Sequence, residues 1–89
     1  MITNIIKTIE QLGKTDDTPL VERVLKLLKE NGELFQAALR TTEVYQGLFM
    51  EDVKEEASDV ALISLSIFFQ AGGTIEELEN TFLKKINEL

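Results

Sequence analysis

The chain has 89 residues, of which 44% are apolar and 28% charged, and this composition predicts one small globular domain spanning residues 1–89. It contains no cysteine and no histidine, which excludes disulfides, thiolate or imidazole metal sites and a histidine general base, so any bound metal ion must take oxygen ligands. The formal net charge of −7 argues against nucleic acid as a partner, because binding to a phosphate backbone needs a basic surface.

The first predicted helix covers residues 2–12, where five aliphatic side chains recur at three- and four-residue spacing. Gly13 is expected to end it, and a polar connection follows. This N-terminal segment has no long apolar stretch and no cleavage site, so it does not resemble a signal peptide. The longest apolar run, residues 60–69, is too short to span a bilayer. We therefore expect a cytoplasmic protein without a membrane partner.

The second predicted helix runs from Pro19 to Leu39. Thr18 before Pro19 indicates its start, because threonine is a frequent N-cap and proline is favoured at the first helical position. Its apolar side chains form two rows, one of Val21, Val24, Leu25, Leu28 and Phe35 and one of Leu20, Leu27 and Leu34. This stripe is wider than one helix contact requires, and a core of this size is marginal for a monomer, so we expect self-association.

Residues 40–50 are predicted to connect the second and third helices, with Gly47 as the turn residue and Tyr45, Leu48 and Phe49 packed against the core. The third helix, Glu51–Gln70, is acidic in its first half and apolar in its second. We expect other helices to bury the apolar half. Gly72 and Gly73 are expected to stop it. Thr74 and Glu77 form a capping-box pattern that opens a fourth helix, whose apolar face comprises Ile75, Leu78, Phe82, Ile86 and Leu89. No strand pattern is present, so the predicted fold is an all-α bundle of four helices.

Two pairs of acidic residues share a three-residue spacing. Glu30 and Glu33 lie in the second predicted helix, and Glu56 and Asp59 lie in the third, just before its apolar half. The carboxylates of each pair share one helix face, about 4.5 Å apart along the axis. If the helices pack antiparallel, all four converge. Two charges about 5 Å apart repel by roughly 3 kcal/mol at an effective dielectric near 20, which favours raised pKa values or a hard divalent cation such as Mg²⁺, Mn²⁺ or Ca²⁺.

A solvated helix surface is the alternative explanation for each pair taken alone. Glu76 and Glu79 have the same spacing without any accompanying feature. Glu51 and Glu55 are expected to be solvated near a helix N-terminus, where negative charge is favourable. The metal-site interpretation depends on the combination of two pairs on adjacent helices with an apolar run directly after Asp59.

The two pairs, separated by 22 residues, resemble the signature of the MazG-like all-α nucleoside triphosphate pyrophosphohydrolases. The segment ENGELFQAALR, which begins at Glu30, is similar to that family's second-helix motif, and EEASDVALISL, which begins at Glu55, is similar to its third helix. Lys84 and Asn87 resemble the Lys-x-x-Asn element near the end of the family domain. The resemblance covers most of residues 19–89.

This resemblance implies a MazG-like four-helix bundle that forms a homodimer or homotetramer. It implies that Mg²⁺, with Mn²⁺ as the substitute, is held by four residues that are also catalytic: Glu30, Glu33, Glu56 and Asp59. The implied reaction is hydrolysis of an NTP or dNTP to the monophosphate and pyrophosphate, by attack of water on a phosphate with one carboxylate as base. Lys84 and Asn87 would contact the substrate phosphates. A surface lysine matched to the helix dipole, and a C-terminal asparagine without a role, are the alternatives.

Other readings stay open at this point. Many family members have a glutamate directly before the first acidic residue, whereas this chain has Lys29, which could mean one metal ion instead of two or weaker activity. Phe35, Tyr45 and Phe49 are candidates for stacking on a nucleobase, with core packing as the alternative. The main competing function is a non-catalytic helical oligomerisation module, and a third is a protein that holds a nucleotide or metal without cleavage.

Overall fold

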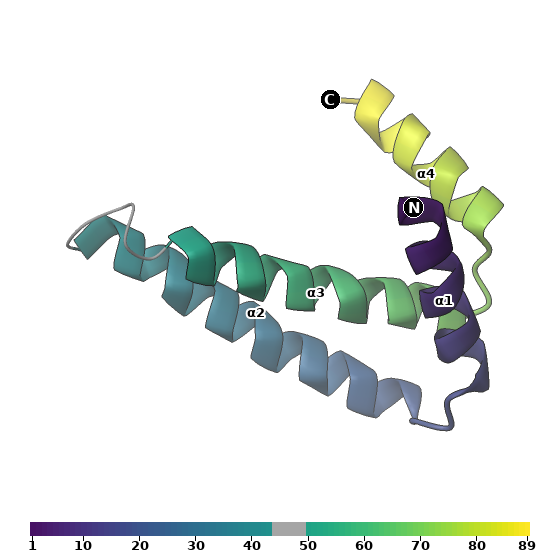
Figure 1. Cartoon of the computed structure of the whole chain (residues 1–89), viewed down its shortest axis with the longest axis horizontal. Coiled ribbons are helices and arrows are strands. Elements are labelled where there is room, and N and C mark those ends of the chain that lie inside the picture. The colour runs from purple at the N-terminus through teal and green to yellow at the C-terminus, as the bar shows by residue number, and fades with distance from the viewer. Residues whose placement is uncertain (44–49) are drawn as a thin grey trace. The chain divides into compact units, whose positions relative to one another are not determined.

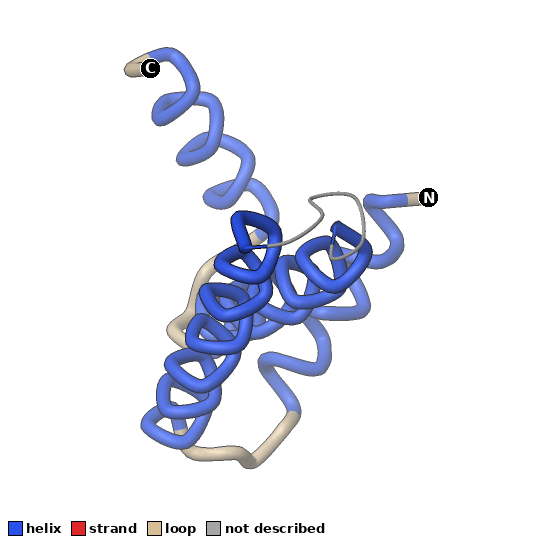
Figure 2. Tube along the Cα trace, turned by 90° about the vertical axis from the view of Figure 1, so that its left-hand side faces the viewer, coloured by secondary structure: helices blue, strands red, loops and turns tan. Residues whose placement is uncertain are grey.

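The computed structural model describes residues 1–43 and 50–89, and these form helices without any strand (Figures 1 and 2). Within these ranges the four helices are α1 (Ile2–Thr15), α2 (Leu20–Glu43), α3 (Met50–Gln70) and α4 (Ile75–Asn87). The predicted all-α fold with four helices is therefore confirmed. None of the described helices is long and apolar enough to cross a membrane. The predictions for Tyr45, Gly47, Leu48 and Phe49 lie outside the described residues.

The chain divides into two compact units. One contains Met1–Asp17 and Leu65–Leu89, and the other contains Thr18–Ser64, so α3 runs from one unit into the other. The core of the first unit is formed by Ile9 of α1, Phe69 of α3 and Leu78 of α4. Phe69 has an exposed fraction of 0%, which makes it the centre of that core.

Gly13 has a different role from the predicted one. We expected it to end the first helix, but α1 continues to Thr15 and Gly13 is buried inside it. A Cβ atom at this position would lie 3.0 Å from Cβ of Phe69 and 3.2 Å from the backbone oxygen of Ser66. Gly13 therefore allows α1 to approach the end of α3 closely. This packing outweighs the cost of glycine within a helix, which is about 1 kcal/mol relative to alanine.

The predicted stop and start signals between α3 and α4 are confirmed. α3 ends at Gln70, and Gly72 adopts a φ of 100°, in the left-handed region that glycine tolerates best. Thr74 is the N-cap of α4, because its side-chain oxygen accepts a hydrogen bond of 3.1 Å from the backbone N–H of Glu77.

The apolar faces of α3 and α4 are less covered than the sequence suggested. Complete burial of the second half of α3 was predicted, but Phe69 is the buried residue of this helix and Leu62 is 48% exposed. On α4, Leu78 is buried whereas Phe82 and Ile86 are exposed. A chain of 89 residues has too few helices to cover every apolar face, since small domains bury a smaller share of their surface.

α2 is longer than predicted. It begins one residue after Pro19 and ends at Glu43, past the predicted end at Leu39. The residues that follow Leu39 include neither glycine nor proline until Gly47, so no local signal stops the helix where its apolar pattern ends.

α2 carries a row of buried or half-buried side chains that is not its most apolar side. The row repeats at four- and three-residue intervals, and we call it the inner row: Arg23, Leu27, Glu30, Leu34, Ala37 and Thr41. Ala37 and Glu30 are buried, whereas Leu28 and Phe35 on another side of the helix are exposed. The inner row thus places a glutamate, rather than the largest apolar side chains, in the protected part of α2.

Candidate metal centre

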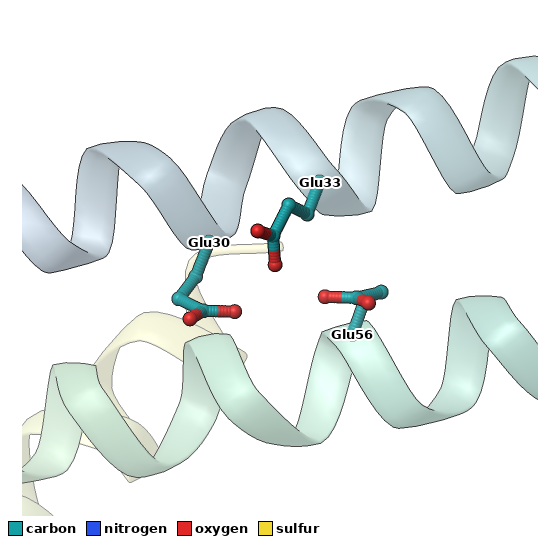
Figure 3. Close-up of side chains that lie close together, drawn as sticks. All are labelled: Glu30, Glu33 and Glu56. Carbon is teal, nitrogen blue, oxygen red and sulfur yellow. The ribbon is translucent and has the colours of Figure 1, made fainter.

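Three of the four predicted metal ligands lie together in the second unit. Glu30 and Glu33 project from α2 toward α3, and Glu56 projects from α3 toward α2 (Figure 3). One carboxylate oxygen from each of these residues lies within 4.8 Å of the corresponding oxygens of the other two. We call these three residues the acidic cluster. The three-residue spacing of Glu30 and Glu33 places both on one side of α2, which is the reason that both meet Glu56.

The acidic cluster is protected from water to different degrees. Glu30 is the most buried, with an exposed fraction of 9%, and Glu33 and Glu56 are half-buried. The Oε2 atoms of Glu30 and Glu56 are both buried and have no hydrogen-bond partner. A buried carboxylate oxygen without a donor loses the hydration that it has in water, so these two atoms are energetically unsatisfied in the protein alone.

Burial and mutual repulsion disfavour the charged form of two residues of the acidic cluster, Glu30 and Glu56. Burial raises the pKa of the Glu30 carboxyl above its ordinary value of 4.5, and the negative charge of Glu33 raises it further. Burial also raises the pKa of Glu56, and the charges of Glu33 and Asp59 add to that effect. Both causes disfavour a negative charge at these positions. A bound proton or a bound cation would therefore relieve the same unfavourable interaction.

Asp59 lies beside the acidic cluster without belonging to it. It is half-buried on α3, three residues after Glu56, and its charge raises the pKa of both Glu30 and Glu56. It is not among the residues whose carboxylate oxygens approach one another within 4.8 Å. Of the four carboxylates that were predicted to converge, three do so. The fourth, Asp59, is close enough for its charge to raise the pKa values of Glu30 and Glu56.

Lys29 lies at the edge of the acidic cluster. Its Nζ is 4.0 Å from Oε1 of Glu33, and its side chain is largely exposed. The positive charge of Lys29 lowers the pKa of Glu30, against the stronger effects that raise it. Lys29 therefore offsets part of the negative charge, although an exposed ion pair of this kind contributes little to stability.

Arg23 is a buried charged residue that the sequence analysis did not identify. It lies on the inner row seven residues before Glu30, which corresponds to a separation of about 10 Å along the helix axis, and it is as buried as Glu30. The seven-residue spacing, two helical turns, was the signal available in the sequence. Arg23 places a positive charge on the same side of α2 as the acidic cluster.

The predicted substrate-binding residues lie in the other unit. Lys84 and Asn87 are exposed in the last turn of α4, and Asn87 is its final residue. Phe35, a candidate for stacking on a nucleobase, is an exposed residue of α2. The roles suggested for these three residues stay predictions.

The residues of the acidic cluster fit a hard divalent cation. All of the ligand atoms that they offer are carboxylate oxygens, which Mg²⁺, Mn²⁺ and Ca²⁺ prefer. Glu30 and Glu56 also each have a buried Oε2 without a hydrogen-bond partner, and a cation bound by these carboxylates would stabilise the charge that burial disfavours. Comparison of the chain with protein-family models, curated proteins and solved structures finds no match. The metal centre is therefore inferred from the geometry of these side chains.

Proposed function

We propose that this chain is a Mg²⁺-dependent nucleotide pyrophosphohydrolase that converts an NTP or dNTP to the monophosphate and pyrophosphate in the cytoplasm. The reaction is the one implied by the resemblance of the acidic motifs to the MazG-like family. The observation that supports it best is that the carboxylates of Glu30 and Glu56 approach each other and Glu33 across two helices, while Glu30 and Glu56 each keep a buried oxygen without a hydrogen-bond partner.

In this proposal Glu30, Glu33 and Glu56 would hold the cation, with Asp59 as an additional acidic residue. When bound, a divalent cation neutralises phosphate charge and lowers the pKa of a bound water molecule, and both effects promote hydrolysis of a phosphoanhydride. One carboxylate would accept the proton of the attacking water. In the metal-free chain the pKa values of Glu30 and Glu56 are raised, and a bound cation would lower them because it stabilises the charged carboxylates.

Polar and positively charged side chains would contact the phosphates. Lys84 and Asn87 would contact phosphate oxygens, as the resemblance implies, and Lys29 would add positive charge at the edge of the acidic cluster. We propose that the enzyme works as a homodimer or homotetramer, in keeping with the apolar side chains that α1, α2 and α4 leave exposed.

Release of pyrophosphate tests the activity directly. The purified chain is incubated with each common NTP and dNTP, with Mg²⁺, with Mn²⁺ and with a chelator, and the pyrophosphate formed is measured. We expect turnover that requires the metal and that Glu56→Gln abolishes. Glu55→Gln is the matched control, since Glu55 is an exposed neighbour on the same helix, and it should retain activity. No metal-dependent turnover by the unchanged chain would refute the proposal.

The second candidate function is a non-catalytic helical oligomerisation module. The observation that favours it is the set of large apolar side chains that α2 exposes, including Leu28 and Phe35. Such a module would form a stable oligomer whose melting temperature does not respond to Mg²⁺ or nucleotide. Stabilisation by nucleotide without product would instead indicate a protein that binds a nucleotide and does not cleave it.

A further inference from the structure

The side of α2 that lies opposite the acidic cluster carries an unbroken apolar row. The row, which we call the outer row, consists of Val21, Leu25, Leu28, Gly32, Phe35 and Leu39. Its intervals are four, three, four, three and four residues, the heptad spacing of a helix that packs along a second helix in a left-handed coiled coil. Its five large side chains are between 44% and 69% exposed, so the described part of the chain leaves this row largely uncovered.

The outer row is separate from the contact between α2 and α3. Each of its members is two positions from a member of the inner row, which corresponds to a rotation of about 200° around the helix axis. The inner row carries Glu30, whose side chain projects toward α3 (Figure 3). α2 therefore has two opposite packing surfaces of the same period, and the outer row is the more apolar of the two.

We propose that the outer row binds the outer row of a second copy of this chain, with the two α2 helices antiparallel and a two-fold axis at residue 30. In this register the central layer pairs a large residue with a small one. Leu28 faces Gly32 of the partner subunit, where, apart from the adjacent residues and nearby helix backbone, a Cβ would meet nothing within 4 Å in the described part of its own chain. Leu25 faces the partner's Phe35, and Val21 faces the partner's Leu39. The proposal does not depend on the proposed enzymatic activity.

A second copy fits this surface better than an unrelated helix, because the row is complementary to itself when reversed. Its centre falls between Leu28 and Gly32, so every layer pairs one member of the first half with one of the second half, as antiparallel coiled coils do. The five large side chains of the row and the adjacent Val24 expose on the order of 100 Å² each. Two copies therefore bring about 1,200 Å² to the contact, the lower limit of a standard protein interface.

The residues that flank the outer row are compatible with this pairing. One flank, Val24, Asn31 and Ala38, carries no charge. On the other flank, Lys29 would approach the partner's Lys29 near the two-fold axis. The ion pair of Lys29 with Glu33 in its own chain, at 4.0 Å, offsets this like charge. Charged residues do not occur in the outer row itself, so no charge is buried when it is covered.

Cross-linking of single cysteine variants tests the direction of pairing, because the chain has no cysteine of its own. Asn31→Cys places a thiol next to the two-fold axis, whereas in Glu22→Cys the two thiols of an antiparallel pair are about 24 Å apart along the axis. A short bis-maleimide should give a covalent dimer with Asn31→Cys and leave Glu22→Cys monomeric. Equal cross-linking of both variants would indicate a parallel contact and overturn the proposal, as would cross-linking of neither.

The size complementarity is tested by exchanging the large and the small residue. Gly32→Leu overpacks the central layer, and we expect the dimer dissociation constant from analytical ultracentrifugation to rise about tenfold or more. Adding Leu28→Ala to Gly32→Leu restores one large and one small residue per layer and should recover most of the affinity. Helical content by circular dichroism verifies that each variant folds. A monomeric unchanged chain at every concentration, or an unaffected Gly32→Leu variant, would refute the proposal.

Discussion

At the scale of single residues, Glu30 determines the character of the acidic cluster. It is 9% exposed and has a buried oxygen without a partner, so its charge is unfavourable until a cation or a proton is bound. A surface pair of glutamates would have neither property. Glu76 and Glu79 on α4 have the same spacing but are exposed, which shows that the spacing alone does not distinguish a ligand pair from a solvated one.

Replacement of Glu30 by glutamine removes the negative charge of this residue and keeps the shape of its side chain. Glu30→Gln removes a charge that burial and Glu33 disfavour, so we expect a higher melting temperature than that of the unchanged chain in metal-free buffer at neutral pH. The same variant should lose the rise in melting temperature that Mg²⁺ gives the unchanged chain. Differential scanning fluorimetry with and without Mg²⁺ measures both, with Glu55→Gln as the control. A destabilised variant that still responds to Mg²⁺ would contradict the metal centre.

The raised pKa values predict a stability that falls as the pH rises. Between the unfolded value of 4.5 and their folded values, Glu30 and Glu56 bind more protons in the folded chain than in the unfolded chain. Their contribution is therefore present at low pH and lost as the pH rises through the folded pKa values. We expect the metal-free chain to melt at a higher temperature at about pH 5 than at about pH 7.5.

The pH dependence has its own control. In the double variant Glu30→Gln/Glu56→Gln this part of the difference should disappear, because neither residue titrates. Saturating Mg²⁺ should also reduce the difference, since it replaces the protons. A metal-free melting temperature that rises steadily with pH, and does so equally in the double variant, would show that the two carboxyls are not under electrostatic strain.

At the scale of helices, the helix ends that local hydrogen bonds and backbone angles determine were predicted correctly from the sequence. The features that depend on packing between helices were not. The start of α4 at Thr74 and the stop at Gly72 depend on hydrogen bonds and backbone angles that a few neighbouring residues determine. The same local rule gave a wrong prediction for Gly13, because the role of Gly13 depends on its contact with Phe69, a residue far along the chain. For α2, periodicity identified two apolar rows but did not indicate which side would face α3.

The packing role of Gly13 is open to a direct test. Gly13→Val places side-chain atoms where even a Cβ would be 3.0 Å from Phe69, and we expect a loss of about 1–3 kcal/mol in the free energy of unfolding. Lys7→Val, at an exposed position of the same helix, controls for the helix propensity of valine and should change stability by about 0.5 kcal/mol or less. Urea denaturation measures both. Equal effects of the two substitutions would argue against close packing at Gly13.

At the scale of the whole molecule, stability depends on very few fully buried side chains. Phe69 fills the centre of the first unit and is 0% exposed. We expect Phe69→Ala to cost about 3–5 kcal/mol, a large part of the stability of a domain of this size, and to leave a chain that unfolds at low urea concentration or at room temperature. Phe82→Ala, at a half-exposed position, should cost far less. Similar unfolding midpoints for the two variants would mean that the core is elsewhere.

The candidate site was predicted from the sequence more completely than its surroundings. The four acidic residues were found by spacing, and three of them meet. Asp59 extends the set only through its charge, because the rotation and offset of two helices determine which carboxylates touch, and neither is encoded in spacing. Arg23 was missed because a lone arginine in an amphipathic helix normally reaches solvent, and only the packing of α2 makes it buried.

The opposite rows of α2 have a consequence for how two copies would work side by side. In the antiparallel dimer the two-fold axis passes level with Glu30, so both acidic clusters would lie at the same level along the helix axes, on opposite sides of the α2 pair. A product leaving one cluster would have to diffuse around the pair to reach the other. If the proposed hydrolysis takes place, each subunit would act on its own substrate, and the dimer would hold two separate sites without channelling between them.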